Sequence, residues 1–523
     1  MMTSLRYWSP VGFALLALGV AAGLPTFSSK WSHVVVGFLV LPLLWSFHYI
    51  QKQPTYPRNS NFWVWGLALL GLVSALLAPN PYTAVLGWVV LVAGLVIFQL
   101  DRSFTVEHRP VVLVGLVVIG VTGAGLSLLA TKTGLNIPWL PPIGKDPLGL
   151  AAFVLLPLAS GVILFKRQAV WKQFALALSC VVLIIPLVSP SFFQQIKEQW
   201  NTTSSLAPAT ASMFTQHWWA GVGLNNYTYV YPQYAVDASI LSHQAPNTLW
   251  DILVSTGVFS SLAFVGLLIV SLAGLRHLPS KKMRVILLVT IVSFFILFWF
   301  GNLWQYPAVL LAFWLLLGLS ASPLPTQENQ AGTRPATRWV TLGLGVVFAL
   351  QSIVMALGLN RFAAAERAAN AGDTKTAVTL YDQSLRFDPD PEQRRAYAES
   401  LWLTGHSSKD FGEAERQARR AMQWNRADAY SRQVAARIAF SQEHFADAER
   451  VYRETLARDP WFSLDAYVAF ADVYKKQDKV REEKAVLDEA LSRFSEAIRQ
   501  RGLAFPAMRD QLERIQQRRT ALE

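Results

Sequence analysis

The chain has few charged residues and a single cysteine. Only 15% of its 523 residues are Asp, Glu, Lys or Arg, whereas 53% are hydrophobic. A chain this apolar cannot bury its hydrophobic side chains in one water-soluble globule, so the composition predicts a membrane protein. The cysteine, Cys180, lies inside an apolar run, which excludes an intramolecular disulfide and any CxxC metal or redox site.

The signatures of several large enzyme classes are also missing. There is no HExxH zinc motif, no P-loop and no GxSxG nucleophile elbow, and the eight histidines are scattered along the chain. We therefore expect no metal and no other cofactor. The formal net charge of +12 does not indicate nucleic-acid binding, because many basic residues lie in short loops beside apolar runs, where they orient a protein in the bilayer.

What the chain has instead is a series of long apolar runs. A bilayer core about 30 Å thick needs roughly 20 helical residues to cross it. Such runs lie near residues 9–27, 31–50, 62–79, 83–100, 110–130, 148–165, 170–190, 247–275, 285–302, 305–320 and 339–358. They predict an all-α, polytopic membrane helix bundle of about eleven spans. The first run could be a secretory signal, but it lacks a clear small-x-small cleavage site, so we expect a retained helix.

Basic residues predict the orientation of this bundle. They occur in alternate loops, which hold Lys52 and Arg58; Arg102 and Arg109; Lys166, Arg167 and Lys172; Arg276, Lys281, Lys282 and Arg284; and Arg334 with Arg338. The positive-inside rule places these loops and the N-terminus in the cytoplasm, and about eleven spans then leave the C-terminal part outside. The count depends most on the runs 285–302 and 305–320, which only Leu303 and Trp304 separate.

The hydrophobic pattern changes near Asn360 to helical pairs that repeat about every 35 residues. Two copies have the small, aromatic, small, proline spacing of tetratricopeptide repeats. They are Ala377, Tyr381, Ser384, Pro389 and Ala448, Tyr452, Thr455, Pro460. Weaker copies are Ala414, Ala418, Ala421 and Glu483, Leu487, Ala490. We predict a membrane domain at 1–360 and a tetratricopeptide-like α-solenoid at 361–523, capped by a helix near 506–521. Such solenoids usually bind protein partners.

One outward segment, residues 191–246, is long and rich in aromatic residues. Loops of this length are uncommon in compact domains unless they are functional. The aromatic side chains include Trp218, Trp219, Tyr227, Tyr229, Tyr231 and Tyr234. Aromatic rings stack on sugars and also anchor proteins at the membrane interface, and the sequence leaves both interpretations open.

The sequence QHWWAGVGLNNYTYVYP, followed by HQAPNTLWDILVSTGVFSSLAFVG, resembles the signature region of the bacterial O-antigen ligase and O-antigen polymerase family, which includes related O-linked oligosaccharyltransferases. The matching positions are Gly221, Gly223, Tyr227, Ala245, Pro246, Asn247, Trp250, Thr256 and Gly257. A second, partial match is GKDPLGLAAFVLLP at residues 144–157. Tetratricopeptide tails outside the membrane are common in this family.

The resemblance implies glycosyl transfer at the outer face of the bacterial inner membrane. In this family a glycan passes from a polyprenyl diphosphate to an acceptor hydroxyl on lipid, glycan or protein, without a nucleotide sugar or a metal. A histidine acts as the general base or orients the acceptor, and arginines bind the diphosphate. The implied partners are therefore membrane lipids and the lipid-linked glycan.

The chain departs from the family pattern at the histidine position. Pro246 stands where family members have the histidine before Asn247, and a proline side chain can neither accept nor donate a proton. His243, three residues earlier, is then the candidate base. His217 is a second outward histidine, at a position that packs in the family pattern.

The family's arginines are missing as well. The outward parts of the membrane domain contain Lys30, Lys132, Lys145 and Lys197 but no arginine. Lys145 is the best-placed substitute, at a helix start that favours anions, although Arg361 and Arg367 could also reach over the site. The predicted substrate-binding residues are Lys145, Lys197, Trp218, Trp219, Gly221, Gly223, Tyr227 and Asn247.

Two interpretations remain open at this stage. One is an active glycan ligase or polymerase that uses His243 and lysines. The other is an inactive family member, a membrane scaffold that recruits a partner through residues 361–523. A transporter or channel is disfavoured, because the apolar runs hold almost no charges except at their ends, and ion paths usually need them.

Overall fold

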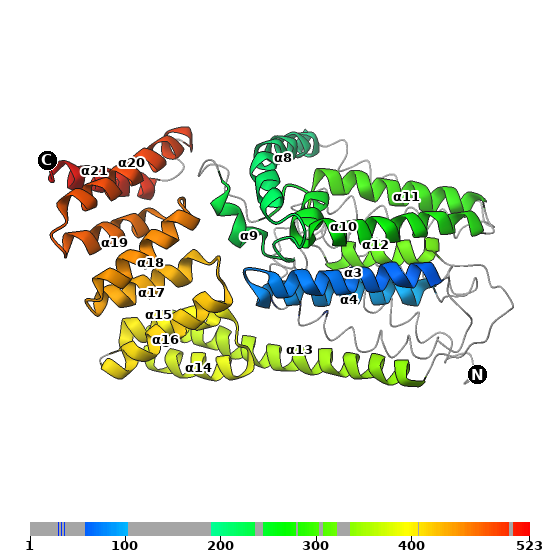
Figure 1. Cartoon of the computed structure of the whole chain (residues 1–523), viewed down its shortest axis with the longest axis horizontal. Helices are drawn as coiled ribbons and strands as arrows, with labels where there is room; N and C mark the ends of the chain where they lie inside the picture. Colours follow the sequence, from blue (N-terminus) through cyan, green and yellow to red (C-terminus); the bar gives the residue numbers. More distant parts are fainter. Residues whose placement is uncertain are drawn as a thin grey trace.

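The computed structural model describes residues 58–102, 190–235, 244–278, 281–302, 307–321, 335–405, 407–501 and 506–523, with Lys30, His33 and Val36. Every regular element in these ranges is a helix, which confirms the all-α prediction (Figure 1). The runs predicted near 9–27, 110–130 and 148–165 lie outside the described residues, as do all but the last residue of 170–190 and most of 31–50.

Apolar helices lie alongside one another and form a bundle (Figure 1). They are α3 (Arg58–Leu77), α4 (Pro81–Arg102), α10 (Thr248–Gly274), α11 (Lys281–Phe300) and α12 (Pro307–Ala321). The apolar first part of α13 (Pro335–Asn370) runs in the same direction but apart from them, and Met355 and Leu359 pack against Leu86 of α4 (Figure 1). Two apolar stretches, Pro81–Gln99 and Thr248–His277, are long enough to cross a membrane. The helices coincide with the runs predicted near 62–79, 83–100, 247–275, 285–302, 305–320 and 339–358.

Helix α12 lies in the middle of the bundle. Its side chains from Val309 to Leu317 are almost completely buried, as expected of a helix that is apolar on all sides. Glycines let neighbouring helices come close to large rings. A methyl group on Gly94 of α4 would lie 2.2 Å from the Trp314 indole of α12, and one on Gly266 of α10 would lie 2.6 Å from Trp63 of α3.

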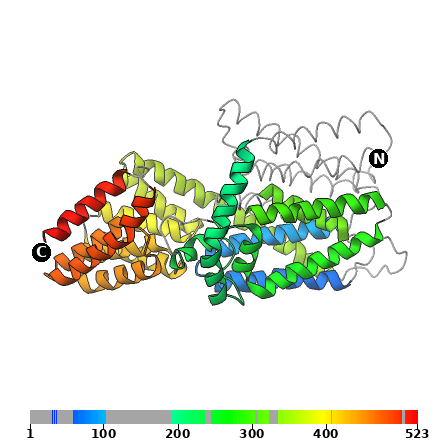
Figure 2. The ribbon, with the colours of Figure 1, turned by 90° about the horizontal axis from the view of Figure 1, so that it is seen from above.

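The segment 191–246, predicted as a long loop, begins instead with helix α8 (Pro190–Gln216). This helix runs across the end of the bundle that is nearest to the C-terminal helices (Figure 2). It is followed by the short helices α9 (Tyr227–Val230) and η2 (Tyr231–Gln233). The polar character of the segment therefore reflects a helix outside the bundle rather than irregular chain.

Helix α13 continues without interruption through Asn360, where the sequence pattern changes, and leads into a second group of helices. This group, the helical array, consists of α14 (Thr374–Phe387), α15 (Pro391–Thr404), α16 (Ser408–Trp424), α17 (Ala429–Ser441), α18 (Phe445–Arg458), α19 (Leu464–Lys475), α20 (Val480–Arg501) and α21 (Pro506–Thr520). Each helix packs on the next.

Small buried residues allow the helices of the array to pack closely, among them Ala377, Ala414, Ala418, Ala448 and Ala490. Side-chain caps begin several of these helices. Asp373, Asp390, Ser407, Asp428 and Ser463 each accept a hydrogen bond from a backbone N–H of the first turn. At the end of the array, Arg518 of α21 pairs with Asp472 of α19 and Glu483 of α20, both at 2.7 Å.

Candidate functional site

The site is built around a break in helix α10. Gly257 has φ 75° and ψ 176°, so two helical pieces meet there at a kink. The segment from Trp218 to Gly223 crosses the kink and forms backbone hydrogen bonds with it. The amides of Val222 and Gly223 donate to the carbonyls of Val254 and Ser255, at 2.9 and 2.8 Å. The crossing chain thus satisfies the carbonyls that the break leaves without helical partners.

Glycines make this crossing possible. Gly221 has φ 73°, and a methyl group on it would lie 2.5 Å from the Ser255 carbonyl oxygen. A methyl group on Gly257 would lie 2.4 Å from the Trp219 carbonyl oxygen. Only glycine tolerates both the positive φ and the close backbone approach. The family-like Gly-x-Gly and Thr-Gly sequences therefore meet in space and have a structural role.

Asn226 holds the same segment against the start of α4. Its side-chain oxygen accepts from the Asn80 amide at 3.0 Å, and its side-chain nitrogen donates to the Asn80 carbonyl at 3.1 Å. The Asn226 side chain is completely buried. This pair of hydrogen bonds fixes the chain just before Tyr227 relative to the bundle.

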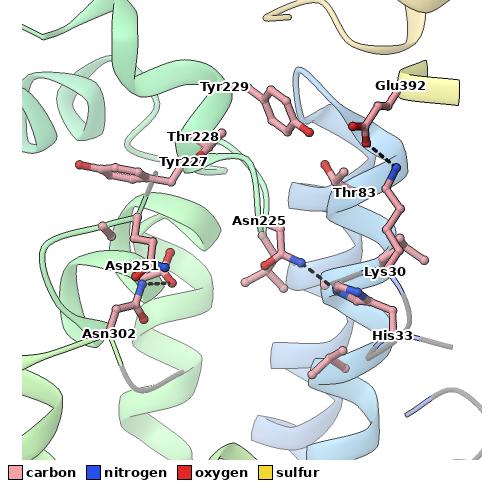
Figure 3. Close-up of a pocket in the computed structure, with 16 residues that line it drawn as sticks. Lys30, His33, Thr83, Asn225, Tyr227, Thr228, Tyr229, Asp251, Asn302 and Glu392 are labelled. Atoms are coloured by element: carbon pink, nitrogen blue, oxygen red, sulfur yellow. Dashed lines mark hydrogen bonds and ion pairs between the residues drawn. The ribbon is translucent and has the colours of Figure 1, made fainter. Parts of the chain in front are cut away.

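A cavity of about 340 Å³ lies between this segment, α4, the first turn of α10 and the helical array. Its polar lining comes from elements far apart in the sequence, namely Lys30, His33, Thr83, Asn225, Tyr227, Thr228, Tyr229, Gln244, Asp251, Asn302 and Glu392 (Figure 3). Leu86, Val90 and Leu224 supply apolar wall. The cavity thus combines an apolar wall with several convergent polar groups, as ligand sites usually do.

Asp251 is the acidic group on the α10 side of the cavity. Its carboxylate accepts hydrogen bonds from the Ser255 hydroxyl at 2.8 Å and from the Asn302 side-chain amide at 3.0 Å. Asn247, which caps α10 by accepting from the Trp250 amide at 2.9 Å, fixes the start of this turn. The carboxylate is therefore held in one orientation while it lines the cavity (Figure 3).

The opposite side of the cavity carries an ion cluster. Lys30 pairs with Asp390, in the loop before α15, and with Glu392 of α15, at 2.7 Å to the latter. Burial would lower the pKa of the Lys30 ammonium, but these two carboxylates raise it above its ordinary value. Lys30 is thus a cation at neutral pH, and the helical array neutralises it.

His33 and the tyrosines complete the lining. The His33 ring nitrogen Nε2 lies 3.2 Å from the Asn225 side-chain nitrogen. The Tyr227 hydroxyl lies 2.8 Å from that of Thr210 on α8, and its ring stacks on Tyr231 at 5.1 Å. Burial raises the pKa of both tyrosines, so they remain protonated hydrogen-bonding groups at neutral pH.

Of the predicted site residues, Tyr227 lines the cavity, and Gly221, Gly223 and Asn247 build its frame. Trp218 and Trp219 do not line it. They are 50% and 48% exposed, and Trp218 lies against Phe259 on the outer face of α10 at 6.1 Å. That position suits an interfacial anchor better than a sugar-binding ring.

Some of the predicted charged residues lie away from the cavity, and the others lie outside the described residues. Lys197, Arg361 and Arg367 are exposed and do not line the cavity. His217 also lies away from the lining, with its Nε2 3.5 Å from the Tyr234 hydroxyl, and burial lowers its pKa. The candidate base His243 and the candidate anion-binding residue Lys145 lie outside the described residues, as does Lys132.

Three ionisable residues of the lining were not among the candidates from the sequence: His33, Asp251 and Glu392. Asp251 and His33 carried a usable signal, because each is an ionisable residue within or at the edge of an apolar run, where such residues are costly and often functional. Glu392 carried none, since it is an ordinary residue in the first turn of an array helix.

Among the described residues, no three His, Cys, Asp or Glu side chains are placed to hold a metal ion. Neither a scan against protein-family models nor a search of the curated proteins gives a match to this chain.

Proposed function

We propose that this protein is a membrane glycan ligase or polymerase of the O-antigen ligase type. It would transfer a glycan from a polyprenyl diphosphate to an acceptor hydroxyl at the outer face of the bacterial inner membrane. One observation carries the proposal: an oriented carboxylate, Asp251, lines a cavity at the first turn of an apolar, membrane-length helix, on the side of Tyr227 and across from His33 (Figure 3).

In this proposal Asp251 takes the role that the family assigns to histidine. The acceptor hydroxyl attacks the anomeric carbon, and the bond from that carbon to the diphosphate oxygen breaks. The polyprenyl diphosphate leaves with the bonding electron pair, while the hydroxyl proton passes to Asp251. Ser255 and Asn302 orient the carboxylate for this transfer, as supporting hydrogen bonds do in general base catalysis.

The proposed architecture is a bundle of about eleven spans followed by a tetratricopeptide-like solenoid. Its N-terminus is cytoplasmic and residues 361–523 are extracytoplasmic. The arrangement of the outward segments supports this orientation. Lys30 pairs with Glu392 of the array, and the amide of Arg426 donates to the carbonyl of Pro79 at 2.9 Å. Asn302, between two predicted spans, lines the same cavity.

The deciding experiment replaces Asp251 with asparagine, which keeps the shape and removes the base. We expect glycan attachment or lengthening to fall by a factor of about 100 or more while the protein still accumulates in the membrane. Asp382→Asn, which makes the same change at an exposed aspartate outside the cavity, is the matched control. Glycans unchanged in Asp251→Asn would refute this assignment. His243→Ala and Lys145→Ala test the two candidates from sequence in the same assay.

A second candidate function is an inactive scaffold that recruits a protein partner through the array. The observation that favours it is the formal charge of the described cavity lining. The lining contains two carboxylates, Asp251 and Glu392, and one Lys, Lys30, so its formal net charge is −1. A diphosphate would meet repulsion there rather than a clamp.

Under the scaffold function, purification in mild detergent should recover a stoichiometric partner that is lost when residues 361–523 are deleted. The two functions separate in the Asp251→Asn variant. A scaffold retains its partner and its phenotype in this variant, whereas the ligase loses its glycan product.

A further inference from the structure

A second pocket lies within the helical array, away from the cavity described above. It has a volume of about 300 Å³ and is lined by α16, α17 and α18. Its walls combine arginines with apolar side chains, including Met422, Ala435, Ala439 and Val451. Neither the sequence motifs nor the proposed transfer reaction makes use of it.

Most charges around this pocket are already paired. Arg419 pairs with Glu415 at 2.5 Å along α16, and Arg450 pairs with Asp447 at 3.0 Å on α18. All four of these side chains line the pocket. The fifth charged residue of the lining, Arg432 of α17, therefore supplies the net positive charge, since three arginines against two carboxylates leave +1.

Arg432 is unusual because it is only 5% exposed. Its Nη1 donates to the carbonyl of Asp428 at 3.3 Å, but among the described residues its Nε has no hydrogen-bond partner. Burial, and next the neighbouring Arg458, lower its pKa to about 10, so it is still a cation at neutral pH. The charges of Glu454 and Asp428 act in the opposite direction, but neither carboxylate accepts a hydrogen bond from Nε among the described residues, and a buried donor left without an acceptor is costly unless a ligand supplies one.

We propose that this pocket binds a carboxylate of an extended peptide segment from a partner protein. The guanidinium of Arg432 would receive the carboxylate, and the apolar side chains of Met422 and Val451 would receive the adjacent aliphatic side chain. A peptide fits better than an acidic sugar, because the apolar part of the lining offers no hydrogen-bond partners to ring hydroxyls.

The test uses the full-length protein in lipid nanodiscs and fluorine NMR line broadening of N-trifluoroacetyl-leucine, compared with its C-terminal amide. We expect the acid to bind about tenfold more tightly than the amide. Arg432→Gln should reduce the affinity for the acid to that for the amide. Arg416→Gln, an exposed and paired arginine of α16 outside the pocket, is the control and should change nothing.

A second variant protects the test against misfolding of Arg432→Gln. Gln423 is exposed at the rim of the pocket, so Gln423→Trp should block the pocket without disturbing the core or the charge, with the same loss of binding. Equal affinities for acid and amide, or acid binding that survives both variants, would overturn the proposal. Tighter binding of glucuronate than of the leucine derivative would overturn the choice of a peptide.

Discussion

Single residues at the helix break have a structural role, although the family resemblance led us to predict Gly221 and Gly223 as substrate-binding residues. Gly221, Gly223 and Gly257 all have positive φ, and each lies against backbone or a methyl group within 2.6 Å of where a Cβ would be. Tyr227 and Asn247 combine roles, since Tyr227 lines the cavity and Asn247 caps α10. The glycine spacing therefore reports how the chain is folded, whereas the proposed transfer reaction rests on Asp251 and its neighbours.

Gly257→Ala tests this structural role. The added methyl group would meet the Trp219 carbonyl, and alanine at φ 75° is strained, so we expect a loss of about 1–3 kcal/mol in the free energy of unfolding. The melting temperature in detergent measures this. Gly343→Ala on α13, where nothing lies within 4 Å, is the control and should leave stability unchanged or slightly higher. Equal melting temperatures for both variants would contradict the proposed strain.

At the scale of helices, the apolar elements were easier to predict than their contacts. Long apolar runs predict α4 and α10 directly, because a helix that crosses the apolar core of a bilayer needs a continuous stretch of apolar residues. The complete burial of α12, the break in α10 and the helix α8 in place of a loop all depend on neighbours that are distant in the sequence. Hydropathy does not encode those neighbours.

Gly94→Ala tests the packing of α4 on α12. Its methyl group would lie 2.2 Å from the Trp314 ring, and this ring cannot move away easily because it is completely buried. We expect destabilisation of about 1–3 kcal/mol, measured by thermal unfolding in detergent. Gly66→Ala on α3, with nothing within 4 Å, should be neutral. A neutral Gly94→Ala would mean that α4 and α12 are not in close contact.

At the scale of the whole molecule, the helical array is part of the cavity rather than an appended module. Glu392 lines the cavity, and Asp390 with Glu392 neutralises Lys30. Tyr82 of α4 donates to the Asp388 carboxylate at 2.6 Å, and the Trp461 indole donates to the Ala235 carbonyl at 3.1 Å. Deleting the array would remove one side of the cavity together with the array surface, so the deletion tests partner recruitment, whereas point variants at this junction test the cavity.

Asp390→Asn should weaken the junction. The carboxylate of Asp390 is almost completely buried, and its loss leaves the Lys30 ammonium with Glu392 alone. We expect a loss of up to about 3 kcal/mol, the lower end for breaking a buried pair. The exposed pair of Arg386 and Asp382 provides the control, since Asp382→Asn should cost less than about 1 kcal/mol. Limited proteolysis between bundle and array, with melting temperatures, measures the difference.

Asp388 makes the junction sensitive to pH. Burial, and next the Asp390 charge, raise the pKa of Asp388 from 3.8 to about 6. The folded protein therefore binds a proton more readily than the unfolded chain, so this residue adds stability as the pH falls from 7 towards 4, and the gain disappears as the pH rises through 6. Tyr82 and Lys30 face the same carboxylate from the bundle side.

The measurement is the melting temperature of wild type minus that of Asp388→Asn, taken at pH 7 and at pH 5. We expect this difference to rise at pH 5, because only the wild type gains the proton. Glu392 contributes to stability with the opposite pH dependence, because Lys30 holds its pKa below the ordinary value. Both proteins contain Glu392, so the subtraction removes its contribution. A difference that does not change with pH would show that Asp388 is not buried at the junction.

The sequence by itself determined the all-helical class of the described residues, the positions of the described apolar helices and the change of pattern near Asn360. These follow from local composition and periodicity, which act through neighbouring residues of one helix. The sequence also identified the segment from His217 to Gly257 as the region that contains the candidate site. Only the tertiary structure decided which groups face the cavity, because Lys30, His33, Asp251 and Glu392 meet through long-range packing. Long-range packing also decided which aromatic residues line the cavity, since Tyr227 faces it and Trp218 lies outside it.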